Sequence, residues 1–348
     1  MVWLSISSRV LINVEALNMV ESIGNYTRHR RAPVVIKTEH GYSIRYVPVI
    51  SGECIAHAFQ AHLARISELR NLPVCELCKC EEFIKRGVPD HKPKDWKVDT
   101  RLNPKDRAHL YEKKVISECV VEDIGGFLHT GEHTGNVPVR RTSCIMFGYA
   151  IPALEDLSQS GIATVEPQFH TRHVKAVARG QREQMIFYVE SGSALYVMSC
   201  AFDVSRVGET SMVKRELVVD SEQKIKRAEA GLDALYLVLV QGKFGAKQSR
   251  FMPDYQVASL VVAVSDRLPF NVKSGHRRTY IRDTLISASA FRTITNSCVR
   301  VFAYVDELDR SIVDLPEDKE LSLMNSPDEL FKEVKHYIVQ LLSESMKK

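Results

Sequence analysis

Long hydrophobic runs are missing from this sequence. No window approaches the roughly 18 consecutive apolar residues that a membrane helix needs, and the densest run, at residues 257–264, has the length of one strand. The N-terminal residues also lack a basic segment followed by an apolar stretch and a small-residue cleavage site, which a secretion signal would have. We therefore expect a soluble, cytoplasmic protein without membrane contact.

A strong charge of either sign is absent as well. The chain has 47 Lys and Arg against 43 Asp and Glu, so its net charge of +4 says little about its partners. The basic residues gather in short runs, such as Arg28–Arg31, Arg140–Arg141 and Arg277–Arg278, whereas acidic residues are frequent over 306–333. Such runs fit a face that binds a polyanion, although a basic run is often only a solvated surface.

Cysteines are scattered, and without an export signal we expect the eight of them to be reduced. One group is close in sequence. Cys75, Cys78 and Cys80, with His91 further on, could bind a structural zinc ion, because cysteines two residues apart can bind one tetrahedral metal. The alternative is free thiols in a loop. The remaining cysteines are expected to fill the core: Cys54, Cys119, Cys144, Cys200 and Cys298.

Apolar spacing and turn residues predict an alternation of strands and helices. The predicted strands cover residues 2–15, 34–37, 42–47, 143–151, 185–189, 194–202 and 257–264. The predicted helices cover residues 52–70 and 105–119, the segment between Asp220 and Gly242, and a C-terminal segment that begins near Ser326. Residues 18–33 are predicted to form a polar loop, and residues 73–104 an irregular insertion.

Without its insertions, the order is strand, helix, strand, strand, helix, strand. This order predicts an α+β, ferredoxin-like core with large insertions. The chain then divides into a first part of the core (1–70), a helical, cysteine-bearing insertion (71–120), a glycine-rich loop with a core strand (121–151), a second insertion (152–184), the rest of the core (185–265) and a C-terminal extension with a docked helix (266–348).

Several motifs occur together and in a specific order. They are Leu17-Asn18, Val20–Asn25, Tyr46–Glu53, Val139–Ser143, Gln168–His170 and Phe244–Phe251. Over residues 5–265 the chain resembles the DevR-like backbone subunit of the archaeal type I-A CRISPR Cascade complex, within the RAMP superfamily. The cysteine-bearing insertion and the residues after 265 depart from this pattern.

The resemblance implies a modified RNA-recognition-motif core and a non-catalytic role in an interference complex. It also implies partners: a guide CRISPR RNA, target DNA paired with that RNA, further copies of the chain in a helical filament, other Cascade subunits and a helicase-nuclease. Coating an RNA without reading its sequence needs cationic and amide donors aimed at phosphates. The residues predicted to supply them are Asn18, Asn25, Arg28, His29, Arg30, Arg31, Arg140, Arg141, His170, Arg172, Lys243, Lys247 and Arg250.

Each group of predicted contacts has a simpler interpretation. The run Arg28–Arg31 could be a solvated loop, and His170 could be a core histidine. The loop over residues 242–251 could be a helix stop with surface lysines; it is not a P-loop, because a helix precedes it and a strand follows. Residues 125–141 are predicted to be a mobile hairpin or loop that orders on RNA. No basic-glycine-aromatic signature occurs over 185–202, so bases are not expected to stack on the sheet.

Two rival functions remain open. The first is a RAMP-type endoribonuclease that processes or cleaves CRISPR-related RNA by histidine acid–base chemistry. The available histidines are His29, His57, His62, His129, His133, His170 and His173. Between Ala16 and Pro33, however, there is no Asp that could help to hold a catalytic metal. The second rival is a protein-only scaffold whose basic loops face acidic partner subunits.

Overall fold

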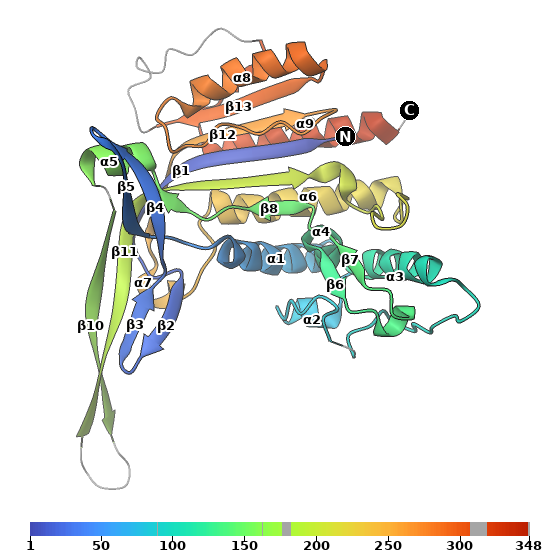
Figure 1. Ribbon diagram of the computed structural model, residues 1–348, viewed down its shortest axis with the longest axis horizontal. Helices are drawn as coiled ribbons and strands as arrows, with labels where there is room; N and C mark the ends of the chain where they lie inside the picture. Colours follow the sequence, from blue (N-terminus) through green and yellow to red (C-terminus); the bar gives the residue numbers. More distant parts are fainter. Residues whose placement is uncertain (89, 162, 176–181, 307–318, 347–348) are drawn as a thin grey trace.

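A large mixed sheet forms the centre of the chain (Figure 1). The computed structural model describes residues 1–88, 90–161, 163–175, 182–306 and 319–346. Across the sheet the strands lie in the order β14, β13, β12, β1, β11, β3, β2, and β8, β9 and β10 also pair with β11. Their bounds are β1 Trp3–Glu15, β2 Met19–Ile23, β3 Tyr26–His29, β8 Ile145–Phe147, β9 Ile151–Pro152, β10 Ala163–Lys175, β11 Arg182–Asp203, β12 Asp254–Ser265, β13 Val299–Val305 and β14 Leu321–Leu323.

The opening strand, β1, lies in the middle of the sheet. It pairs antiparallel with β11 on one side and with β12 on the other, so that Leu4 lies between Phe202 and Val264. Leu4 and Ile6 are almost completely buried. Burying such an aliphatic side chain contributes about 1.5–3 kcal/mol to folding. The strand predicted over residues 2–15 is confirmed.

Helices cover both faces of the sheet. On one face α1 (Gly52–Leu69) packs against α6 (Ser221–Leu239), and α6 in turn contacts α9 (Pro327–Met346). On β12, Val262 packs in this larger core, whereas its neighbour Val261 belongs to the opposite face. That opposite face is covered by α8, which spans Tyr280–Thr295. The residues after 265 therefore extend both the sheet and its helical cover.

Local capping explains why the two core helices begin where they do. The Ser51 hydroxyl accepts a hydrogen bond from the backbone N–H of Cys54 at 3.2 Å, and the Asp220 carboxylate accepts one from Gln223 at 2.7 Å. Both predicted helices are confirmed. The second ends at Leu239, three residues before Gly242.

Two strand predictions need correction. The strand predicted over residues 143–151 is divided into β8 and β9, both paired with β11. The two strands predicted over 185–202 form one strand, β11, without a turn at Ser191–Ser193. Gly192 lies opposite Glu15 of β1 and Val165 of β10, so neighbouring strands hold this segment extended on both sides.

The segment predicted as a polar loop over residues 18–33 forms strands instead. β2 and β3 make a hairpin whose turn contains Gly24 at φ 61°, a left-handed conformation that glycine tolerates. The strands predicted over residues 34–37 and 42–47 are confirmed as β4 (Arg31–Thr38) and β5 (Gly41–Pro48), which pair as a second hairpin. Sequence pattern missed β2 and β3 because their side chains are mostly exposed and do not alternate apolar with polar.

The insertion after α1 contains short helices and a small sheet. Its elements are α2 Glu76–Lys79, α3 Pro104–Glu118, α4 Val120–Gly125, β6 Phe127–His129 and β7 Val139–Arg141. The helix predicted over 105–119 is confirmed as α3. Of the two forms predicted for residues 125–141, the structure shows the hairpin: β6 and β7 pair, and Val139 packs with Tyr111 of α3 in a separate cluster.

The second insertion builds a projecting arm. After β9 come α5 (Leu154–Ser160) and β10, which pairs with β11 from Ala163 to Lys175. This hairpin extends well beyond the rest of the molecule (Figure 1). Among the helices in the described ranges, none is both long and apolar enough to cross a bilayer.

Candidate nucleic-acid interface

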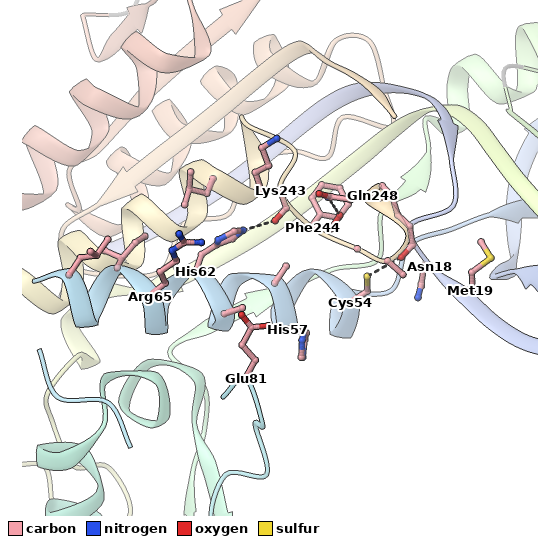
Figure 2. Close-up of a pocket in the computed structure, with 18 residues that line it drawn as sticks. Asn18, Met19, Cys54, His57, His62, Arg65, Glu81, Lys243, Phe244 and Gln248 are labelled. Carbon is pink, nitrogen blue, oxygen red and sulfur yellow. Dashed lines mark hydrogen bonds between the residues drawn. The ribbon is translucent and has the colours of Figure 1, made fainter. Parts of the chain in front are cut away.

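A groove of about 920 Å³ lies between α1 and the segment that follows α6 (Figure 2). We call residues 242–251 the basic loop; it ends in the short helix α7 (Gln248–Phe251). Asn18 and Met19, after β1, line the end of the groove. The polar side chains lining it come from four separate segments: Asn18, His57, His62, Arg65, Glu81, Lys243 and Gln248.

Contacts with β1 and α1 hold the basic loop in place. The Ala246 N–H donates to the Leu17 carbonyl at 2.8 Å, and the ring of His62 donates from Nε2 to the Lys243 carbonyl at 2.7 Å. Gly245 has a φ of 85°, and a Cβ there would lie 2.6 Å from that of Leu17. Only glycine fits this close approach. The loop is thus fixed before any ligand binds.

The groove and the basic loop carry cations that are not neutralised. Within the described ranges, no ion pair involves Arg65, Lys243, Lys247 or Arg250. Arg65, Lys243 and Arg250 are exposed, and Lys247 is half-buried. Burial and the neighbouring charge of Arg250 lower the pKa of Lys247. Because the exposed Glu81 is the only carboxylate among the described residues that line the groove, the surface favours an anionic ligand.

Asn18 joins the groove to the start of α1. Its side-chain oxygen accepts a hydrogen bond from the Ser51 N–H at 2.8 Å, and its backbone carbonyl accepts one from Arg30 at 2.9 Å. The residue is 9% exposed. Asn18 therefore positions the groove, and it can offer only a small part of its surface to a ligand.

The base of the projecting arm meets the basic loop through aromatic rings. The His170 ring stacks on Phe187 with centroids 5.2 Å apart and lies edge-on to Phe251 at 5.7 Å. His170 is half-buried, while its neighbour Phe169 is exposed. The structure thus brings His170 close to the loop that carries Arg250. Arg172 lies in β10, but its side chain falls outside the described residues.

The predicted basic run, residues 28–31, lies beside the arm and is partly paired. Arg28 is exposed and pairs with Glu21 at 3.3 Å, and Arg31 pairs with the buried Glu190 of β11 at 3.0 Å. Arg30 is half-buried. Asn25, at the tip of the β2–β3 hairpin, donates to the Ile186 carbonyl at 3.1 Å. These side chains remain near the surface, but a phosphate would compete with their carboxylate partners.

His29 does not belong to this surface, which corrects the sequence prediction. Its ring is buried, and Nε2 lies 2.5 Å from the Glu15 carboxylate, which also accepts from Tyr196 at 2.7 Å. Burial lowers the pKa of His29, but the hydrogen bond and charge of Glu15 outweigh this and raise it overall. Burial likewise raises the pKa of Glu15, and the bond to His29 reverses the shift. His29 and Glu15 therefore form a buried ion pair between β3 and β1, which has a structural role.

Arg141 is also a correction. Its guanidinium is completely buried and donates to Asp123 at 2.6 Å, while the other Asp123 oxygen accepts from Arg227 at 2.8 Å. Arg140 is exposed, but it lies on β7 beside α3 and α4, away from the arm and α7 (Figure 1). The pair Arg140–Arg141 is therefore not part of the surface formed by the groove, the basic loop and the arm.

The cysteine cluster has a different membership from the predicted one. Ligand atoms of Cys75, Cys78 and Cys119 lie within 4.8 Å of one another and could hold a metal ion. Cys80 is exposed and outside this group, although it is close in sequence. Cys119, which was predicted to pack in the core, is the third member of the group in place of Cys80. His91 lies near Cys75, in a second group of potential ligands that includes Glu122.

Sequence reasoning missed the contribution of α1 to the groove. His57, Ala61 and Arg65 recur every fourth residue, and His62 lies one position further round the helix. Residues four apart share one face of a helix. Polar residues beside the apolar residues of the helix predicted over 52–70 were the available signal. They could not show which other segment this side of the helix faces.

Comparison with known proteins gives a consistent result. Residues 6–285 match the family model described as CRISPR-associated negative auto-regulator DevR/Csa2. The CRISPR-associated aCascade subunit Cas7/Csa2 2 of Saccharolobus solfataricus is 41% identical over 295 residues, which cover 83% of this chain and 88% of that protein. The CRISPR-associated protein Cas7/Csa2 1 of the same organism is 36% identical over 335 residues, covering 94% and 96%.

A solved structure also matches the whole chain. One chain of a CRISPR RNA-guided surveillance complex, pre-nicking, aligns with a TM-score of 0.51 at 12% sequence identity, covering 96% of this chain and 99% of that chain. At such low identity the match shows a shared fold only. The α+β class predicted from the sequence agrees with it.

Proposed function

Because the chain belongs to the DevR/Csa2 family of CRISPR-associated proteins, we propose that it is a backbone subunit of a Cascade-type surveillance complex that binds guide RNA. The observation that supports this most strongly is a set of cations that form no ion pair with any described residue: Arg65 on α1, and Lys243, Lys247 and Arg250 on the basic loop. Phosphates are the anions that such a rigid, sequence-independent surface would take.

We propose that the core is ferredoxin-like, of the modified RNA-recognition-motif type. Across the sheet these strands lie in the order β12, β1, β11 and then β8 with β9. If β8 and β9 count as one strand, they are the fourth, first, third and second strands of the core in chain order. α1 and α6 are the two helices that this order requires on one face. In this division, residues 71–120 and 152–184 are insertions, and residues after 265 are an extension.

In the proposed binding mode, RNA follows the groove and the basic loop and passes the base of the arm. Phosphates contact the four cations, and no base edge needs to be read. Phe169 and Ile186 are exposed on the arm, where they could act as wedges between bases. The paired residues Arg28 and Arg31 would contribute less, because their carboxylate partners must first be displaced.

We propose a non-catalytic role rather than RNA cleavage. Of the candidate histidines, His29 and His129 are buried, and His62 is bonded to the Lys243 carbonyl. His57 lines the groove, and in the described ranges no hydrogen bond or ion pair joins its ring to Glu81 or to another acid. General acid–base cleavage would need a second group placed across the scissile phosphate.

We further propose that copies associate head to tail along the RNA. A heterologous interface that does not close generates a filament. The β4–β5 hairpin has an exposed apolar face that would suit such a contact, formed by Val35, Tyr42, Ile44 and Tyr46. Target DNA would then be reached by pairing with the bound guide, and other Cascade subunits would contact the ends of the row.

Removing two cations of the basic loop should weaken RNA binding in a salt-dependent manner. For the Lys247→Ala/Arg250→Ala variant we expect the affinity for single-stranded RNA at 0.1 M salt to fall roughly 10- to 30-fold, and the slope of log affinity against log salt to shrink by about 1.4. The same loss is expected for unrelated RNA sequences. Fluorescence anisotropy across a salt series measures both quantities.

The matched control removes one lysine and one arginine elsewhere. Lys105 starts α3 and Arg267 follows β12 at the far end of the sheet, and both are exposed. Lys105→Ala/Arg267→Ala should leave the slope unchanged. Equal slopes for both double variants would refute the role of the basic loop, and cleaved RNA in denaturing gels of the same samples would favour the endoribonuclease.

A further inference from the structure

Potential metal ligands gather in two overlapping groups in the insertion, and none of their residues lines the groove. We propose that Cys75, Cys78, Cys119 and His91 bind a structural zinc ion. The three sulfur atoms lie within 4.8 Å of one another, and His91 belongs to a ligand group that shares Cys75. Three thiolates and one imidazole form a common tetrahedral set for structural zinc. This inference is independent of the proposed RNA binding.

Two backbone features bring these ligands together from distant parts of the chain. Cys75 precedes α2 and Cys78 lies within it, so one helical turn places both thiols on the same side. Cys119 is the joint between α3 and α4. The Val120 N–H donates to the Pro73 carbonyl at 2.9 Å, which fixes this joint beside the start of α2.

The surroundings of His91 favour it as the fourth ligand. Nδ1 carries the ring's lone pair, because it accepts a long hydrogen bond from the Arg86 N–H at 3.2 Å. Nε2 is buried without a hydrogen-bond partner in the described residues and faces the Glu122 carboxylate at 3.8 Å. A carboxylate behind the second ring nitrogen is the usual arrangement around a zinc-bound histidine.

Glu122 itself is a poor candidate for the fourth position. Its carboxylate is buried and already accepts three hydrogen bonds from the Arg86 guanidinium, at 2.7, 2.9 and 3.0 Å. Coordinating zinc would leave the buried Arg86 charge without its partner, which is costly. Glu122 therefore supports His91 and does not replace it.

The site is accessible and would have a structural role. A cavity of about 400 Å³ is lined by Cys75 and His91 and also by the exposed Lys92 and Lys94, which gives an ion a route from solvent. Binding would release the three thiol protons to solvent. The ion would connect α2 and the irregular segment after it to the α3–α4 joint, where regular secondary structure supplies few constraints.

Metal analysis of the full chain, purified under reducing conditions from zinc-supplemented medium, tests this proposal. Wild type and Cys80→Ser should each hold one zinc per chain, whereas Cys119→Ser should hold almost none and His91→Ala should lose zinc more readily to a chelator. The Cys80 variant is the matched control, since Cys80 is nearest in sequence and outside the cluster.

A second measurement covers the case in which Cys119→Ser fails to fold. Chelator should lower the melting temperature of the wild type by about 5 °C or more, and added Zn²⁺ should restore it. Cobalt should give the intense absorption of a tetrahedral thiolate site in wild type and Cys80→Ser. Wild type without zinc, a Cys119 variant that keeps it, or a disulfide within the cluster in the reduced protein would overturn the assignment.

Discussion

The Asp123→Asn variant is expected to lose about 3–5 kcal/mol of unfolding free energy, the usual cost of breaking a buried ion pair from one side. Asp123 is completely buried and contacts the guanidinium groups of Arg141 and Arg227 at 2.6 and 2.8 Å. It also accepts from the Gly208 N–H. Asparagine keeps the shape but leaves two buried cations with less compensating charge.

Urea denaturation followed by circular dichroism measures this loss. The control is Asp99→Asn, which removes a half-buried carboxylate paired with the exposed Arg101 in the same insertion. Exposed ion pairs contribute little, so this variant should unfold close to the wild-type midpoint. If Asp123→Asn unfolded there too, the buried network would not be holding α4, β7 and α6 together.

The parts of the fold that were predictable depend on local signals. α1 and α6 have a capping side chain and apolar residues at helical spacing, and β1 has a dense apolar sequence. β2 and β3 have neither signal, because most of their side chains are not buried and the strands are held by pairing, β2 with β3 and β3 with β11. The break predicted between the strands over 185–189 and 194–202 is wrong for the same reason: β1 and β10 pair with this segment of β11 and keep it extended.

The candidate site was predictable to the extent that its residues lie in one segment. The basic loop has two glycines and three cations within ten residues, so residues 242–251 stand out as one segment in the sequence alone. Burial by distant partners was not predictable. His29 is buried in an ion pair with Glu15, and Arg141 is buried in an ion pair with Asp123. The potential metal cluster contains Cys119, which is distant in sequence, and does not contain Cys80.

Reversing two charges of the groove should have the largest effect on RNA binding. For Arg65→Glu/Lys243→Glu we expect an affinity loss of about 100-fold at 0.1 M salt, since two phosphate contacts are lost and two repulsive charges are added. Both side chains are exposed, and they approach the groove from α1 and from the basic loop. The loss should be smaller at high salt, where screening weakens both effects.

The matched control for this variant is Lys105→Glu/Arg267→Glu, which changes the net charge equally. If binding followed net charge alone, the two variants would lose affinity together. A specific groove predicts a loss only for Arg65 and Lys243. The melting temperature of each variant should stay near wild type, because none of these four side chains forms a buried contact.

The most direct test of RNA binding is the nucleic acid that copurifies with the chain from cells that express a CRISPR transcript. We predict that wild type retains RNase-sensitive nucleic acid of guide length after low-salt purification and loses it as salt is raised. Arg65→Glu/Lys243→Glu should retain almost none, whereas Lys105→Glu/Arg267→Glu should match wild type. A wild-type chain that carries no RNA and does not bind guide-length RNA at low salt would contradict the account.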